Sequence, residues 1–311
     1  MKHWNNFPMG PACREFLEIS KENYEGEQQS RPDEDTAVQF QSELLVHIES
    51  HKPKNVLEFV DLLEEFTNMG LSIASVKLYE SNDFPEASEN FRAMLSVGSA
   101  YMMESDLESA ESALKKAQAL EPSEASSYVN LANLYYSQHR DKDSLIWAEA
   151  GLGAEPNHHR LWEVIASIFM AEDMAGAGDR VRQLAEDHNS FAGLSLAAHL
   201  IAPDDLLYKS QLLEKPFDSG IRDEEYLVEY TAALGLAQQF EKIPAVLWQL
   251  ERVEGKKASW KLKSHVAQAF FAMDQEKEAK ELIAGLEKSD IPSGILTDLK
   301  QTYEQQFTED A

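Results

Sequence analysis

The chain has 311 residues, a net charge of −27 at pH 7 and a hydrophobic fraction of 43%. That hydrophobic fraction is enough for a continuous core and argues against disorder over most of the length. The negative charge is spread along the whole chain and would repel a phosphate backbone, so we expect no nucleic acid partner.

Cysteine usage and hydropathy bear on the compartment. Cys13 is the only cysteine, so no intrachain disulfide can form, and a reducing compartment is expected. The N-terminal residues contain no apolar run of signal-peptide length, and no later run reaches the roughly 18 apolar residues of a membrane-spanning helix. We therefore predict a soluble, cytoplasmic protein that contacts no membrane.

The N-terminal part of the chain divides into an arm and a cap. Residues 1–35 are rich in proline, glycine and charge, which predicts an irregular arm with a short helix. Residues 36–90 follow a helical period, which predicts an N-terminal helical cap and a partial repeat. Within this part, residues 84–103 fit either a truncated repeat or one long helix with Pro85 in its first turn. We favour the long helix.

A pattern of large, small and aromatic residues begins at residue 91 and returns every 34 residues. Spacings of three, one and three place each set on one face of a helix. The sets are Met94, Val97, Gly98 and Tyr101; Tyr128, Leu131, Ala132 and Tyr135; and Trp162, Ile165, Ala166 and Phe169.

A second set follows each of the first two and predicts a second helix that packs on the first. Its small members would let the two backbones approach closely, and its proline disfavours helical geometry in the residue before it. The sets are Ala110, Leu114, Ala117, Leu120 and Pro122, and then Ser144, Ala148, Gly151, Ala154 and Pro156.

This period and these residues resemble the tetratricopeptide repeat. The match covers 91–124 and 125–158, and from residue 159 it holds for the first helix only, because Arg182 replaces a large apolar residue and Ser190 replaces the proline. The resemblance implies an all-α fold, a right-handed α-solenoid of antiparallel helix pairs with residues 91–190 as its core repeats. Residues 191–311 then predict divergent helical repeats and a C-terminal capping helix.

No group of residues predicts a catalytic site, a cofactor site or a metal site. The sequence contains no glycine-rich phosphate loop, no Gly-x-Ser-x-Gly turn and no paired cysteines. His47 and His51 have the spacing of metal ligands on a helix, but Pro53 follows at once, and we interpret both as surface residues.

The resemblance implies instead a peptide-binding groove, lined by first-helix residues that do not pack on the second helix. Methionine adapts to differing apolar shapes, and asparagine can bond a peptide backbone through both its donor and its acceptor. Packing between repeats is the alternative role for Met102 and Met170. The groove residues are Leu95, Ser99, Met102, Met103, Val129, Asn133, Tyr136, Arg160, Glu163, Ser167 and Met170.

One basic cluster interrupts the acidity, and we interpret it as an ordinary solvated loop, because Trp260 is its only aromatic residue. Its members are Arg252, Lys256, Lys257, Lys261 and Lys263.

Together these features predict a non-enzymatic scaffold or adaptor that binds a protein or peptide segment in the groove. The alternatives are a secretion-type chaperone, although such chaperones are typically about half this length, and an enzyme whose site lies in the divergent C-terminal third.

Overall fold

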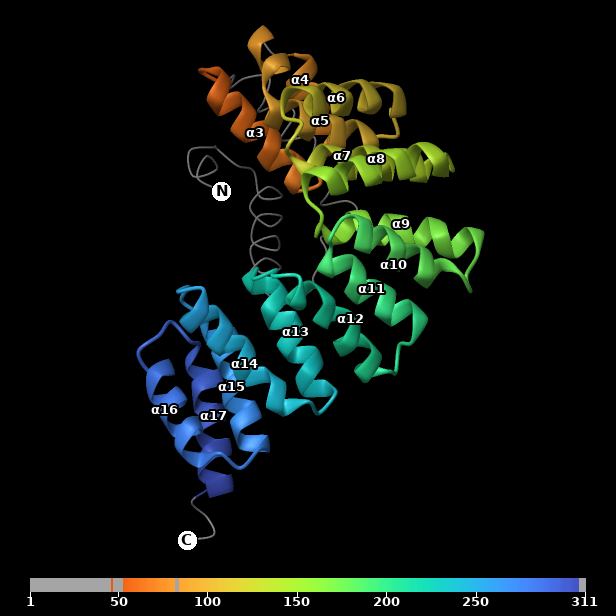
Figure 1. Cartoon of the computed structure of the whole chain (residues 1–311). Coiled ribbons are helices and arrows are strands. Elements are labelled where there is room, and N and C mark those ends of the chain that lie inside the picture. Colours follow the sequence, from red (N-terminus) through yellow and green to blue (C-terminus); the bar gives the residue numbers. More distant parts are fainter. Residues whose placement is uncertain (1–45, 47–52, 82–83, 308–311) are drawn as a thin grey trace. The chain divides into compact units, whose positions relative to one another are not determined.

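The computed structural model describes residue 46 and residues 53–81 and 84–307, and in these ranges the regular elements are all helices. The predicted all-α fold of consecutive antiparallel helix pairs is therefore confirmed (Figure 1). The chain divides between Glu155 and Pro156 into two compact units. The predicted arm at 1–35 and the histidines at 47 and 51 lie outside the described residues.

The described part of the first unit consists of successive helix pairs, each joined by a short turn. A 3₁₀ helix, η2 (Pro85–Glu89), lies between the first pair and the second. The pairs are α3 (Val56–Asn68) with α4 (Ser72–Glu80), α5 (Phe91–Met103) with α6 (Leu107–Leu120), and α7 (Ala125–Ser137) with α8 (Asp141–Ala154).

The single long helix expected over residues 84–103 is wrong. Asn90 has an extended backbone, with φ −108° and ψ 122°, and its side-chain oxygen accepts a hydrogen bond from the Ala93 N–H at 3.1 Å. Asparagine is among the best N-cap residues because this bond satisfies a donor that the helix itself leaves unpaired. The helix therefore starts again at Phe91, and Pro85 opens only the short η2.

The turns of the two clearest repeats have the same backbone geometry. Ser105 and His139, 34 residues apart, have φ of 61° and 57°. In each turn the N–H of the following residue donates a hydrogen bond to a carbonyl of the first helix. Asp106 donates to the Tyr101 carbonyl and Arg140 to the Tyr135 carbonyl, both at 3.0 Å. This pattern satisfies carbonyls at the end of the first helix and sends the chain back antiparallel.

The repeated aromatic position also has a structural explanation. The Tyr128 hydroxyl donates a hydrogen bond to the Pro122 carbonyl at 2.9 Å. In the second unit, the indole N–H of Trp162 makes the equivalent bond to the Pro156 carbonyl at 2.8 Å. Proline marks the turn, and the following aromatic side chain satisfies the carbonyl that the turn leaves without a helical partner.

The second unit is helical throughout its described residues. Its elements are α9 (His159–Glu172), α10 (Ala177–Asp187), α11 (Phe191–Ile201), α12 (Leu206–Asp218), α13 (Glu224–Leu236), η3 (Phe240–Lys242), α14 (Ile243–Trp248), the π-helical turn η4 (Gln249–Val253), α15 (Trp260–Ala272), α16 (Glu276–Leu286) and α17 (Ser293–Phe307).

The repeat pattern weakens after α9 because α10 packs more extensively on α11 than on α9. A Cβ atom placed on Gly193 of α11 would lie 2.7 Å from the Ala185 Cβ of α10 and 2.6 Å from the Trp162 ring. The small residues of α10 therefore allow close packing on the next helix in the chain, α11, rather than on the preceding one, α9.

At the C-terminal end of the second unit, α17 packs against α15 and α16. Leu299 is buried there, and the ring of Phe307 lies 6.3 Å from the ring of Phe271. The remaining positions of α17 are largely exposed, so one face of the helix covers the core and the other meets solvent.

Substitution of Gly98 tests the close helix approach in the first unit. A Cβ at this position would lie 2.7 Å from two side-chain atoms of Leu114 and 3.3 Å from its backbone nitrogen. We expect Gly98→Ala to lower the free energy of unfolding by about 1–3 kcal/mol, because the α5–α6 crossing must open.

Gly153→Ala is the matched control, because a Cβ there meets no atom within 4 Å. It should raise stability slightly, since alanine favours the helix by up to about 1 kcal/mol over glycine. Urea unfolding followed by circular dichroism measures both variants. Equal midpoints for the two would contradict the packing at Gly98.

Candidate functional site

The predicted groove residues of α5 divide into packed and exposed positions. Leu95 and Met102 are half-buried against the core of the first unit, whereas Met103 is 54% exposed. The Ser99 hydroxyl donates to the Leu95 carbonyl and accepts from the Asn130 amide, both at 2.8 Å. This bond ties α7 to α5, so Asn130 is engaged in structure.

On α7, the predicted residues differ in how they can reach a partner. Val129 is 3% exposed and lies in the interior, so its side chain is not available to a ligand in this conformation. Tyr136 is 38% exposed. Asn133 is half-buried, and its amide makes no hydrogen bond to the described residues. Asn133 and Tyr136 therefore present polar and aromatic groups to solvent.

The other predicted groove residues lie on α9, in the second unit. Arg160 and Glu163 are exposed and Met170 is half-buried. The Ser167 hydroxyl donates to the Glu163 carbonyl at 2.8 Å, a bond within the helix. These side chains belong to the second unit, whereas the helices α5 and α7 belong to the first.

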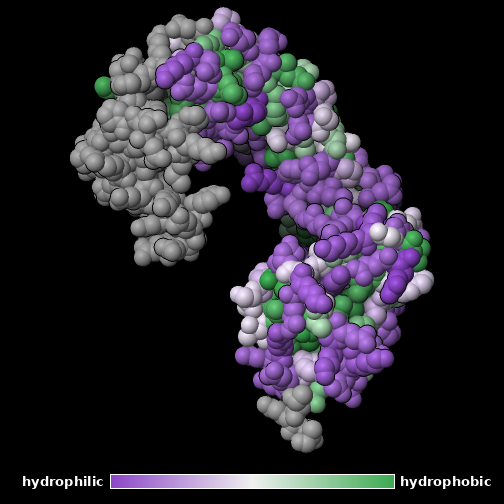
Figure 2. Space-filling view, turned by 90° about the vertical axis from the view of Figure 1, so that its left-hand side faces the viewer, coloured by the Kyte–Doolittle hydropathy of each residue, from purple (hydrophilic) through white to green (hydrophobic). Residues whose placement is uncertain are grey.

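The described residues include no group of three or more His, Cys, Asp or Glu side chains that could hold a metal ion. None of the described helices has the length and apolar character needed to span a membrane. In the view of Figure 2, hydrophilic residues cover most of the described surface, and hydrophobic residues lie in small groups.

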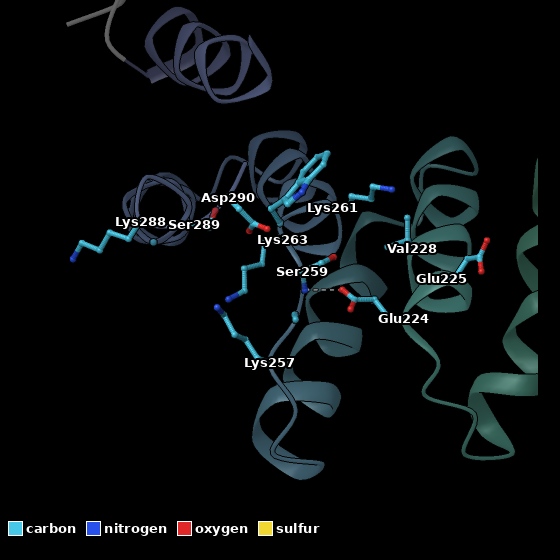
Figure 3. Close-up of a pocket in the computed structure, with 13 residues that line it drawn as sticks. Glu224, Glu225, Val228, Lys257, Ser259, Lys261, Lys263, Lys288, Ser289 and Asp290 are labelled. Carbon is cyan, nitrogen blue, oxygen red and sulfur yellow. Dashed lines mark hydrogen bonds between the residues drawn. The ribbon is translucent and has the colours of Figure 1, made fainter. Parts of the chain in front are cut away.

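The second unit contains a cleft that the groove prediction did not include. Two adjoining hollows, with cavity volumes of about 610 and 440 Å³, share Val228, Trp260 and Lys261 as lining residues. We call the larger one the basic hollow and the smaller one the narrow hollow. Their walls come from α13, from α15 with the loop before it, and from α16, α17 and the loop between them (Figure 3).

In the basic hollow, some charges are already paired. Lys263 forms an ion pair with Glu251 at 2.8 Å, and the Glu224 carboxylate accepts a hydrogen bond from the Ser259 N–H at 2.6 Å. Lys257 and Lys261 are exposed and form no ion pair with the described residues. The Lys261 ammonium lies 5.9 Å from the centre of the Trp260 ring, a cation–π distance.

The narrow hollow contains a histidine that is hydrogen-bonded to the neighbouring helix. His265 Nδ1 lies 2.9 Å from the Thr231 hydroxyl, which also lies 2.8 Å from the Leu227 carbonyl. Burial lowers the pKa of His265 below its ordinary value, which favours the neutral ring. A neutral imidazole ring has one nitrogen that donates a hydrogen bond and one that accepts.

The solvated-loop interpretation of the basic cluster holds for Lys256 and Lys257, which are exposed in the loop before α15, whereas Lys261 and Lys263 lie on α15. Arg252 and Lys256 are exposed and line neither hollow, whereas Lys257, Lys261 and Lys263 line the basic hollow. A signal in the sequence was Ser259, a good N-cap residue directly before Trp260, which places both at the start of a helix rather than inside a loop.

No protein family model matches the chain, and no curated protein matches it. Solved structures do. A tetratricopeptide repeat protein from Parabacteroides merdae ATCC 43184 is 12% identical, with 94% of this chain and 99% of that chain covered and a TM-score of 0.38. The MamA protein is 19% identical, with 63% and 97% covered and a TM-score of 0.39.

A third solved structure, the P58(IPK) TPR domain, is 12% identical, with 96% of this chain and 77% of that chain covered and a TM-score of 0.34. None of these scores reaches 0.5, so the architecture rests on the helix pairs of the chain itself, with their 34-residue offset and repeated turn geometry. This chain is similar to tetratricopeptide repeat proteins. Its repeats are clearest in α5–α8 and diverge in the second unit.

The lowered pKa of His265 predicts a pH-dependent contribution to stability. As pH falls below about 6.5, the unfolded chain takes up a proton at this position that the folded chain resists. The stabilising contribution is therefore fully present above pH 6.5 and is lost as pH falls below it. We expect His265→Gln to lose less unfolding free energy than the parent between pH 7.5 and pH 5.

Urea unfolding at several pH values measures this difference. His159→Gln is the control, because His159 is exposed and this variant should follow the parent. Identical pH dependence in the parent and in His265→Gln would show that His265 is not held in its neutral form by burial.

Proposed function

We propose that the chain is a non-enzymatic interaction scaffold that binds a segment of another protein on the face formed by α5 and α7. The observation that supports this proposal is the exposure of Met103 on α5 and of Tyr136 on α7, together with an Asn133 amide that has no partner among the described residues. These side chains lie on helices whose other faces are fully engaged in the core.

The chemistry of this face suits a peptide with apolar anchors. Methionine side chains are flexible and polarisable, and a tyrosine ring contributes a large apolar area with a polar end. The Asn133 amide can donate and accept at once, as a peptide backbone requires. Ser99 is held by Asn130 and Leu95, and Leu95 and Met102 are half-buried against the core.

A rigid scaffold supports this role. The α5–α6 and α7–α8 pairs have the most extensive contacts between helices in the described chain, and Asn130 links α7 to α5. Helices fixed by such packing lose little further backbone freedom when a partner binds, which favours affinity. Binding of this kind requires no cofactor and no metal ion.

The double variant Asn133→Ala/Tyr136→Ala tests the proposed face. We expect it to bind the partner about 2 kcal/mol more weakly, roughly a 30-fold loss, because aromatic anchors dominate such interfaces. The partner is the protein that the immobilised parent captures from lysate, identified by mass spectrometry and then titrated in purified form. Its binding should persist at roughly 0.5 M salt, since screening weakens only charge contacts.

The matched control is Ile146→Ala/Glu149→Ala on α8, where both side chains are exposed on the other helix of the same pair. This control should bind like the parent. If the partner binds the Asn133→Ala/Tyr136→Ala variant with unchanged affinity, the α5–α7 face is not its site.

A further inference from the structure

We propose that the cleft of the second unit is a second binding site, which takes an acidic, partly apolar segment of a protein in extended form along α15. Carboxylates of the segment would lie at Lys257 and Lys261 in the basic hollow, and an apolar side chain would lie in the narrow hollow. This site is separate from the α5–α7 face, and the inference does not rest on the function proposed for that face.

The basic hollow carries a small positive charge in a chain that is strongly negative. Its lining contains four lysines, Lys257, Lys261, Lys263 and Lys288, and three carboxylates, Glu224, Glu225 and Asp290, a charge of +1 in a chain of −27, and the narrow hollow adds the carboxylate of Asp298. At physiological salt the Debye length is about 8 Å, so distant carboxylates are largely screened. An acidic segment in the basic hollow therefore interacts mainly with the charges that line it, among which lysines are in excess.

The pairing of charges inside the basic hollow leaves cations available. The Glu224 carboxylate is bonded to the Ser259 N–H, and Lys263 is paired with Glu251. In Figure 3 the Glu225 carboxylate points away from Lys257 and Lys263, whereas Asp290 points toward Lys263. Lys257 and Lys261 have no ionic partner among the described residues and are the groups that a carboxylate would meet.

The narrow hollow has different chemistry and would recognise a different part of the segment. Ile295 and the half-buried Val228 supply apolar surface, and Trp260 borders both hollows. His265 Nε2 can form a hydrogen bond with a peptide backbone, and the exposed Gln268 amide can donate and accept. Extended peptides are recognised in this way, by backbone hydrogen bonds with pockets for alternate side chains.

The observations favour a protein segment over a nucleic acid. A nucleic acid carries a charge on every phosphate and would place many of them against a chain of −27. A nucleic acid site would also be expected to supply several aromatic platforms for bases, whereas the two hollows together include Trp260 alone. A peptide with a few carboxylates and an apolar side chain matches both hollows.

Fluorescence anisotropy of a synthetic probe tests the site. The probe is a fluorescein-labelled peptide of about a dozen residues in which glutamates are interspersed with leucines, titrated with the full chain at about 0.15 M salt, where a Debye length of about 8 Å screens the distant carboxylates of the chain. The same peptide with glutamine in place of glutamate should bind about tenfold more weakly, since it lacks the charge contacts. Replacing its leucines by serine should also weaken binding about tenfold, because the apolar contact is lost.

The decisive variant is Lys257→Gln/Lys261→Gln, which should bind the glutamate probe about tenfold more weakly than the parent. Lys277→Gln/Lys280→Gln on α16 is the matched control, because both lysines are exposed and line neither hollow. Replacing them removes the same charge as the Lys257→Gln/Lys261→Gln variant. This control should bind like the parent. Circular dichroism of each variant checks that the fold is unchanged.

Several results would overturn the proposal. They are equal binding of the glutamate and glutamine probes, no binding of the glutamate probe by the parent, and equal affinity of the two lysine variants. Tighter binding of labelled oligothymidylate than of the glutamate probe would indicate a nucleic acid site instead. The Asn133→Ala/Tyr136→Ala variant should bind the probe normally, and loss of binding there would move the acidic segment to the α5–α7 face.

Discussion

Close approach of paired helices is the constraint on which the rest of the structure depends. At Gly98 the backbone of α5 comes so near to Leu114 of α6 that an added methyl group would overlap the leucine. Such proximity requires a sharp reversal of the chain, which the left-handed conformation of Ser105 provides. The pair then buries one stripe of each helix and leaves the outer side of the first helix free to carry Met103.

The same turn geometry is kept where the sequence pattern fades. Asn189 after α10 and Asp274 after α15 have φ of 51° and 58°, and the residue that follows each bonds back to a carbonyl of the helix, Ala185 and Phe270 respectively. A turn of this kind needs backbone hydrogen bonds rather than particular side chains, so it survives sequence divergence. The architecture therefore extends into the second unit although the repeat pattern does not.

Sequence reasoning succeeded where a contact is local or strictly periodic. The set from Met94 to Tyr101 is buried as predicted, because its spacing alone determines a helix face. The long helix over 84–103 failed because the capping bond of Asn90 outweighs the helical pattern around it. The resemblance to the tetratricopeptide repeat places Val129 in the groove, but its side chain is buried. Burial depends on neighbouring helices, and the residue pattern of one helix does not specify which side chains those helices cover.

The cleft of the second unit was beyond prediction for a related reason. Val228, Trp260 and Ile295 come from three helices that are distant in sequence, and only the packing of α13, α15 and α17 brings them to one cleft. Lysines in a mainly acidic chain predict local charge but not whether each is paired. The structure separates Lys263, which Glu251 neutralises, from Lys257 and Lys261, which remain available.

The two candidate surfaces differ in the forces that would hold a partner. Binding at one can therefore be distinguished from binding at the other by its dependence on salt. Contacts through Met103 and Tyr136 are mainly apolar and depend little on salt, whereas contacts through Lys257 and Lys261 weaken as screening increases. Each surface lies within one compact unit and is built from helices that contact their neighbours in the chain. Because repeat structures propagate stability mainly between neighbours, a substitution at one surface should leave the other folded. A partner that needs both surfaces would therefore lose affinity in each single-surface variant, while two independent partners would each respond to only one.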